Sequence, residues 1–398
     1  MKKQYAGFIG IYMFSYFCIG ALFPLLGQYL KSIGFNGVQI GTITASATAA
    51  GIIAAPFWGA VYERRNCSRK LLYILYGAAL ILILMLSFIT NYGLFLAVFI
   101  AAFFFESPIR PLNDAITLSS GHVFGKVRLW GSAGFALGVF LAGLIAERAG
   151  LITIFPMYSI SMLLGLLFLV SIRPPKKDQC QAGSDSDVLA VTDLHEKGPA
   201  GSFGKLLANK RYVALVLSAF FMNGTMIANN TYFGFLYLEA GGTIAGIGMA
   251  LLLMVSSEIP MMWLAEAIGR KISAEKLLLM VMILSAARFL WYGTTPSTLL
   301  LVSTFFIQGV NNGIFLIIAV KYIDRLVDKS ILGSAITWYT AIGSNAGSIV
   351  CLFAGGLLVD HYSGAAVYLF YGLMNLAGVL IYVTCGLHKS KKNDGNEI

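Results

Sequence analysis

Charged residues are scarce in this sequence. They make up 12% of its 398 residues, whereas 58% are hydrophobic; soluble domains carry about 25% charged residues. Together with a mean hydropathy of +0.79, this composition excludes an ordinary soluble domain and indicates a polytopic membrane protein. Twelve spans of about 20 residues need only about 240 residues, which leaves short loops and no room for a large soluble domain.

Several site patterns are missing as well. The five cysteines are scattered and none stands in a C-x-x-C or metal-ligand spacing, so we expect free thiols and no metal. No G-x-x-x-x-G-K-[ST] loop occurs, which argues against ATP as the energy source. We therefore expect neither a cofactor nor an enzyme activity. Lys2 and Lys3 precede an apolar run that lacks a small-residue cleavage site, which indicates a retained first span rather than a signal peptide.

Apolar runs predict an all-α membrane protein with twelve transmembrane helices in two six-helix bundles. A polar stretch over 173–208 cannot bury a core and divides six spans from six. We expect one bundle at 1–172, a cytoplasmic linker at 173–208, a second bundle at 209–388 and a tail at 389–398. The predicted spans are 5–30, 39–62, 71–90, 92–118, 127–146, 151–172, 210–236, 242–267, 275–293, 296–323, 333–358 and 364–386.

The net charge of +10 is explained by basic residues in the loops between the spans rather than by a nucleic-acid-binding site. Nearly all basic residues fall at the termini, in the linker and in the even-numbered loops, whereas Lys31 and Arg148 lie on the other side. This is the positive-inside pattern. We therefore expect a multi-pass protein of the cell membrane that has both termini in the cytoplasm and binds no nucleic acid. Each half offers the other a partner face in the lipid bilayer, so we expect a monomer.

Three charges stand on one stripe of the fourth span. The run Phe103–Leu118 is apolar enough for a span, yet it carries Glu106, Arg110 and Asp114 at positions i, i+4 and i+8. On one continuous helix these side chains share a face. Because a charge at mid-bilayer costs at least about 2.5–3.5 kcal/mol, the stripe must face protein or water. We interpret it as one wall of a substrate pathway.

Glu106 and Arg110 allow two interpretations. They could form a self-neutralising i, i+4 pair, or Arg110 could clamp a substrate carboxylate. The corresponding positions in the second half carry Gln308 and Asn312, so the polar stripe is charged in one half and neutral in the other. Tyr16 of the first span belongs to a minority of aromatic residues that we expect to stack on a substrate ring.

Acidic residues are rare inside the predicted spans. Of the 18 acids, only Glu106, Asp114 and Glu258 lie well inside a span, whereas Glu266 and Glu275 stand at span ends. Glu258 has no cation in its own span and stands close to Pro260, which can free backbone carbonyls. We predict that Glu258 exchanges the coupling proton and is released from Arg288 of the ninth span when the site reorganises.

Two stretches carry a family resemblance. Ser107–Ala115 (SPIRPLNDA) and Phe124–Phe135 (FGKVRLWGSAGF) together resemble the phenylpropionate-permease family of the major facilitator superfamily. They are more distantly similar to its lactose-permease and nucleoside–proton symporter branches. The resemblance continues at Glu258, at Arg288 and at Lys321-Tyr322-Ile323, so it covers both halves.

The resemblance implies roles for single residues. Asp114 stands where lactose permease has a substrate-binding glutamate, and Arg128 stands at the arginine that partners it. Glu258 matches a second sugar-binding glutamate, and Arg288 matches a coupling arginine. Asp114 and Arg128 could equally be a structural pair that ties spans four and five together.

The chain departs from lactose permease where that protein carries its proton. Span ten has Gln308 and Asn311 in place of a histidine and a glutamate, and span seven has Asn229 and Asn230 in place of acids. A proton carrier must then lie elsewhere, which favours Glu258.

The loop after span two resembles the superfamily signature G-x-x-x-[D/E]-R followed by R-K, and the pattern recurs after span eight. The resemblance implies a cytoplasmic gate that locks neighbouring helices in one conformation. The alternative is a plain positive-inside anchor. The gating residues implied are Glu63, Arg64, Arg69, Glu266 and Arg270.

These observations predict a secondary active transporter, a proton-coupled symporter of a small organic solute that works by alternating access of two bundles. An aromatic or other small carboxylate would use Arg288 or Arg110 as counter-ion, whereas a sugar or nucleoside would use Asp114 and Glu258 as acceptors. An efflux antiporter of the same fold stays open. The substrate-binding candidates are Asp114, Arg128, Arg110, Glu106, Asn312, Gln308 and Tyr16.

Overall fold

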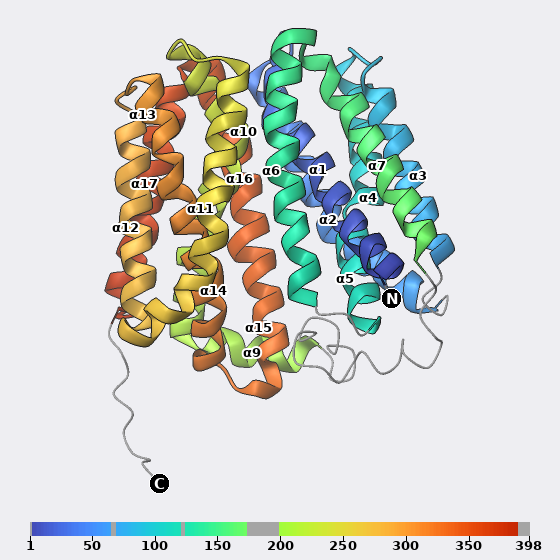
Figure 1. Cartoon of the computed structure of the whole chain (residues 1–398). Helices are drawn as coiled ribbons and strands as arrows, with labels where there is room; N and C mark the ends of the chain where they lie inside the picture. The colour runs from blue at the N-terminus through green and yellow to red at the C-terminus, as the bar shows by residue number, and fades with distance from the viewer. Residues whose placement is uncertain (1, 65–68, 121–123, 173–198, 389–398) are drawn as a thin grey trace.

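The computed structural model describes residues 2–64, 69–120, 124–172 and 199–388, and within them the protein is helical with no strand. Figure 1 shows two groups of helices side by side, α1 to α7 in one and α10 to α17 in the other. Helix α1 begins and α17 ends at the same face, which we name the terminal face. The opposite face is named the closed face, because the two groups meet there.

The first bundle uses six spans, of which the fourth is split in two. Its helices are α1 (Lys2–Ser32), α2 (Gly37–Arg64), α3 (Arg69–Leu86), α4 (Tyr92–Glu106), α5 (Ile109–Ser119), α6 (Phe124–Ala149), the short η1 (Leu151–Thr153) and α7 (Ile154–Ser171).

The second bundle also uses six spans, and two of them are split. Its helices are α10 (Lys210–Glu239), α11 (Ile244–Lys271), α12 (Ala274–Tyr292), α13 (Thr298–Ser303), α14 (Phe305–Leu326), the short η3 (Lys329–Ile331), α15 (Leu332–Trp338), the π-helical η4 (Tyr339–Ala346), α16 (Gly347–His361) and α17 (Gly364–Thr384). Helix α9 (Pro199–Ala208) lies at the terminal face, inside the segment expected to link the bundles.

The predicted all-α fold with twelve spans is confirmed. Eleven helices in the described part of the chain are long and apolar enough to cross a membrane. Helix α12 is long enough at 19 residues, but its apolar run is interrupted by Glu275, Lys276 and Arg288. Large apolar side chains also cover the outside of the protein, as Phe88 and Leu299 do at 84% and 75% exposure. Such a surface suits lipid rather than water.

Span four departs from the continuous helix that the charge stripe assumed, because the chain breaks at Pro108. A proline has no N–H, and its ring clashes with the carbonyl four residues earlier. That carbonyl, of Phe104, instead accepts a hydrogen bond from the indole Nε1 of Trp58 at 3.0 Å. The break separates Glu106 on α4 from Arg110 on α5, yet the two side chains still form an ion pair.

Carboxylates join the two bundles at the closed face. Asp360, near the end of α16, accepts hydrogen bonds from the backbone N–H of Gly37 and, at 2.9 Å, of Val38 in the first turn of α2. Glu147 of α6 accepts one from the N–H of Ala245 in the first turn of α11 at 2.5 Å. In each case an acid of one bundle meets the positive end of a helix dipole in the other.

Glycines let the bundles approach closely beside these acids. A Cβ placed on Gly143 of α6 would lie 3.2 Å from the Cα of Gly248 in α11, and one on Gly356 of α16 would overlap the carbonyl of Gly37. Among the described residues, the hydrogen bonds and glycine contacts that join the bundles lie in the half toward the closed face. The bundles therefore meet on one side of the membrane midplane.

Small residues also determine how α6 crosses α1. A Cβ on Gly134 would overlap the carbonyl of Met13, and one on Gly138 would overlap that of Phe17. Such close crossings are typical of membrane helices with small residues at the contact. This crossing brings the α1 side chains Tyr12 and Tyr16 beside the first turns of α6.

Candidate functional site

Asp114 is held by side chains from two other helices. Its Oδ1 accepts a hydrogen bond from the Tyr12 hydroxyl of α1 at 2.5 Å. Its Oδ2 lies 3.8 Å from Nη1 of Arg128, which is near the start of α6. The expected pairing of Asp114 with Arg128 is therefore present, and the tyrosine is an added partner. Because 26% of the Asp114 side chain and 55% of the Arg128 side chain are exposed, the group can also meet a solute.

This cluster lies toward the terminal face. Asp114 is five residues from the end of α5, which is about 8 Å along the helix axis at 1.5 Å per residue. Tyr16 stacks on Tyr12 with ring centroids 6.4 Å apart. Its ring also packs against Gly131, where a Cβ would come within 2.9 Å of it. The cluster thus combines an acceptor, a cation and an aromatic face in the half of the first bundle toward the terminal face.

Glu106 and Arg110 form the internal ion pair that was one of two interpretations. The guanidinium of Arg110 binds Oε1 of Glu106 closely and lies 3.4 Å from Oε2. The Glu106 side chain is completely buried, whereas 27% of the Arg110 side chain is exposed. A buried carboxylate needs such a cation. In this structure Arg110 is therefore bound to the carboxylate of Glu106.

Glu258 lies in the middle of α11, with a partner from α14. Nδ2 of Asn312 donates a hydrogen bond to its Oε2 at 3.3 Å. Gly309 and Gly313 allow this contact, because α14 packs there directly on the backbone of α11; a Cβ on Gly313 would lie 2.8 Å from the Glu258 carbonyl. Glu258 is 13 residues from the end of α11, or about 20 Å, so its carboxylate stands near the membrane midplane.

Arg288 does not pair with Glu258 in this structure. It is 5% exposed, and its guanidinium carbon lies 4.8, 5.1 and 5.7 Å from the ring centroids of Phe289, Tyr292 and Phe305. Cation–π contacts of this kind stabilise a desolvated cation. Within the described residues its Nε and Nη1 have no hydrogen-bond partner. The predicted release of Glu258 from Arg288 is therefore not a feature of this conformation.

Gln308 faces a buried network rather than open space. It is 1% exposed, and its Oε1 accepts a hydrogen bond from Nδ2 of Asn229 at 3.0 Å. Oδ1 of Asn229 accepts one from the hydroxyl of Tyr368 at 2.6 Å. Buried polar groups require such partners. The structure thus separates Gln308 from Asn312, which remains beside Glu258.

A polar group that the sequence did not predict surrounds the π-helical segment η4. Nδ2 of Asn223 in α10 donates to the Ser344 hydroxyl at 2.9 Å and to the Tyr339 hydroxyl at 3.3 Å. Tyr339 is 8% exposed and belongs to the hydrophobic core of the second bundle. π-Helical turns inside α-helices often mark functional positions. An asparagine in the apolar first half of this span was the available signal.

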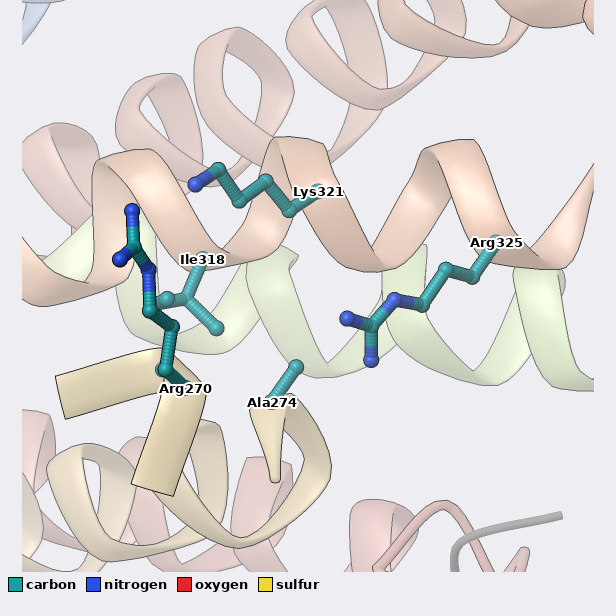
Figure 2. Close-up of a pocket in the computed structure, with 6 residues that line it drawn as sticks. Arg270, Ala274, Ile318, Lys321 and Arg325 are labelled. Carbon is teal, nitrogen blue, oxygen red and sulfur yellow. The ribbon is translucent and has the colours of Figure 1, made fainter. Parts of the chain in front are cut away.

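The predicted gating residues with described side chains, Arg64, Arg69 and Arg270, each have their own surroundings. Arg64 is exposed at the end of α2. Arg69 of α3 binds the carbonyls of Ile172 and, at 3.3 Å, Leu169 at the end of α7, a contact within one bundle. Arg270 lines a pocket at the terminal face of the second bundle (Figure 2). The side chains of Glu63 and Glu266 lie outside the described part of the structure.

Taken together, the geometry offers a solute two polar groups on opposite bundles. One contains Asp114 with Tyr12, Tyr16 and Arg128, and the other contains Glu258 with Asn312 and lies near the midplane. Carboxylate and amide oxygens accept hydrogen bonds from hydroxyl groups.

Known proteins are similar to this chain in sequence and in fold. The MFS_1 like family matches residues 5–370. The maltose permease of Geobacillus stearothermophilus is 31% identical over 391 residues, which cover 97% of this chain and 95% of that protein. A probable 3-phenylpropionic acid transporter of Escherichia coli is 25% identical, covering 93% and 94%. The crystal structure of the nucleoside transporter NupG superposes with a TM-score of 0.82 at 16% identity, covering 96% of this chain and 98% of that chain.

The family match spans most of the chain, and the relatives match 97% and 93% of its length. The predicted resemblance to the superfamily is thereby confirmed. The chain belongs to the MFS_1 like family of the major facilitator superfamily, and it is a multi-pass secondary transporter.

Proposed function

We propose that this protein is a proton-coupled symporter of a neutral, sugar-like solute. The observation that carries the choice of substrate is the state of the two arginines that could have clamped a carboxylate. Arg110 is bound to Glu106, and Arg288 is enclosed by aromatic rings at 5% exposure. A carboxylate substrate would have to break the first pair or enter the second bundle's core.

Hydroxyl groups meet better partners. Asp114 and Glu258 are each partly exposed carboxylates, and Asn312 and Tyr12 stand beside them. Charged acceptors make stronger hydrogen bonds than neutral ones. Tyr16 supplies an aromatic face next to Asp114. The similarity over nearly the whole chain to a protein named maltose permease supports the same substrate class.

Glu258 is the residue to which we assign the proton. It stands near the midplane, and its neighbour is an amide rather than a cation. A carboxylate there must lose its charge or gain a cation each time the site closes, because a charge at mid-bilayer is costly. We assign Arg288 to coupling together with Glu258. A repacking that moves the Arg288 guanidinium away from the aromatic rings around it would provide the cation for Glu258.

Alternating access would proceed by rocking of the two bundles. The bundles, proposed at 1–172 and 209–388 with 173–208 as linker, meet at the closed face, so the site opens toward the terminal face. Basic residues concentrate at helix ends on that face, which supports its position on the cytoplasmic side of the cell membrane. A monomer suffices, since each bundle provides the partner face of the other. The implied gating residues, Glu63, Arg64, Arg69, Glu266 and Arg270, would act at this opening.

Reconstitution into liposomes tests the proposal. With an inwardly directed proton gradient, labelled maltose should accumulate above its outside concentration and a protonophore should abolish the accumulation; protein-free liposomes are the control. In detergent, sugars should raise the melting midpoint, because a ligand of the folded state stabilises it. Stabilisation by 3-phenylpropionate alone would identify an acid permease. Loading of the solute into energised inverted vesicles would identify an efflux antiporter.

A further inference from the structure

Arg288 is a buried cation with no acid beside it. The residue is buried, and no ion pair in the described part of the chain includes it. The described groups that act on its charge are the tyrosines Tyr292 and Tyr368, of which Tyr292 also forms a hydrogen bond with it. A buried charge is costly unless an opposite charge and hydrogen bonds compensate it. The aromatic rings around the guanidinium stabilise the cation, but they do not neutralise its charge.

Arg288 cannot become neutral by itself. A buried carboxylate can take up a proton, whereas a guanidinium group keeps its proton in proteins. Glu258 and Arg288 stand at similar depths, 13 residues from the end of α11 and 14 residues from the start of α12. The Glu258 carboxylate nevertheless bonds to Asn312 instead. Among the described residues, none therefore supplies the negative charge that Arg288 needs in this conformation.

Three buried nitrogen atoms in this part of the second bundle have hydrogens to donate and no hydrogen-bond partner in the described structure. They are Nε and Nη1 of Arg288 and Nε2 of Gln308. Buried donors in native proteins nearly always have a partner, which is either a protein group or a bound water or ion. All three atoms are donors, and together with the charge of Arg288 they favour an anion over a water molecule.

One polar network connects the two side chains that carry these donors. Tyr368, which acts on the charge of Arg288, donates a hydrogen bond to Oδ1 of Asn229 at 2.6 Å. Nδ2 of Asn229 donates in turn to Oε1 of Gln308 at 3.0 Å. Phe305, whose ring centroid lies 5.7 Å from the guanidinium carbon, stands three residues before Gln308 and therefore on a neighbouring part of the α14 surface. Arg288 and Gln308 thus border the same part of the bundle interior.

We propose that Arg288 and Gln308 bind a small monovalent anion, a halide such as chloride, inside the second bundle. The guanidinium charge would pair with the ion, and the unpaired N–H groups of both side chains would donate charge-assisted hydrogen bonds to it, which are stronger than neutral ones. Aromatic rings enclose the guanidinium, so the site suits an ion about the size of a water molecule better than an organic acid. Anion binding here does not depend on the proposed solute or on proton transfer at Glu258.

The chloride dependence of the melting midpoint tests this site. The purified chain in neutral detergent is melted at rising sodium chloride, and sodium gluconate replaces the missing chloride so that sodium and ionic strength stay constant. The midpoint should rise with chloride, because a ligand of the folded state stabilises it, whereas gluconate is too large for the enclosed site. Arg288→Met keeps an apolar side chain and should lose the rise. Gln308→Met should need about tenfold more chloride for the same rise, since it removes one donor to a charged group.

Arg325→Gln is the matched control, because it removes an exposed guanidinium group from the same bundle; it should keep the native response to chloride. The proposal is overturned if the native chain melts at the same temperature in chloride and in gluconate, if Arg288→Met keeps the rise, or if Arg325→Gln loses it equally. Crystals of the native chain grown in bromide give a second measurement that needs no variant. An anomalous difference peak beside the Arg288 guanidinium supports the site, and the absence of a peak there overturns it.

Discussion

Removal of the Asp360 carboxylate should loosen the closed face. This side chain accepts hydrogen bonds from the first-turn N–H groups of Gly37 and Val38 in the other bundle. A side-chain cap contributes about 0.5–2 kcal/mol, and a charge at a helix end about 0.3–1 kcal/mol. The Asp360 carboxylate and the α2 end that it caps are both near the surface. Asp360→Ala should therefore shift the balance between closed and open forms by about 1–2 kcal/mol, a factor of about 5–30 in population.

Electron-electron distance measurements can read this shift. Nitroxide labels at Thr90→Cys and Thr294→Cys would stand on exposed closed-face connections of opposite bundles. The exposed Cys385 would be replaced by serine, as would Cys67 and Cys180. In Asp360→Ala the long-distance population should grow, and it should grow further when Glu147, the equivalent acid of the other pair, is also changed to alanine, since distant sites add.

The chain contains a matched control for this experiment. Glu239 of α10 accepts a hydrogen bond from the N–H of Gly364 at the start of α17, at 2.8 Å. The chemistry is the same, but both helices belong to the second bundle. Glu239→Ala should therefore lower the melting midpoint without moving the label distances. If Asp360→Ala, like Glu239→Ala, gave the same distance distribution as the native chain, the Asp360 carboxylate would have no part in closure.

Three further changes test the site and the fold. Glu258→Gln should retain exchange of labelled solute across liposomes yet lose accumulation against a gradient; wild-type accumulation would remove Glu258 from coupling. Asp114→Arg combined with Arg128→Asp should regain transport that each single change loses if the pair is structural, and should stay inactive if Asp114 binds solute. Trp58→Phe leaves the Phe104 carbonyl without its hydrogen bond, so unfolding in detergent should become easier by about 1–3 kcal/mol, measured by melting against the native chain.

The sequence predicted the parts of the fold that depend on composition and short-range patterns. The number of spans follows from apolar runs, and the Glu106–Arg110 pair follows from residues four apart. A continuous helix was expected over 92–118, although the break at Pro108 was readable, because proline cannot continue the hydrogen-bond ladder. Its consequence was not: the Trp58 indole that binds the freed carbonyl comes from another helix, and no sequence pattern specifies that contact.

Partners within the candidate site were predictable only where a resemblance supplied them. Asp114 and Arg128 were paired on that basis, but Tyr12, which makes the shortest contact to Asp114, was missed because it comes from a helix about 100 residues away. The neutral counterparts of the stripe, Gln308 and Asn312, looked equivalent on sequence. In the structure Gln308 belongs to a buried network with Asn229 of α10, whereas Asn312 lies beside Glu258 of α11. The difference depends on which neighbouring helix each side chain meets.

The two bundles stabilise their buried charged side chains in different ways, and this difference supports the assignment of the proton to Glu258. In the first bundle Glu106 is neutralised by a cation on the next helix segment and Asp114 stands near one. In the second, Glu258 has an amide neighbour, while the buried cation Arg288 is stabilised by rings. A carboxylate with a fixed cation can keep its charge through a transport cycle. A carboxylate without one must exchange a proton or move to a cation, and either event couples its charge to the movement of the bundles.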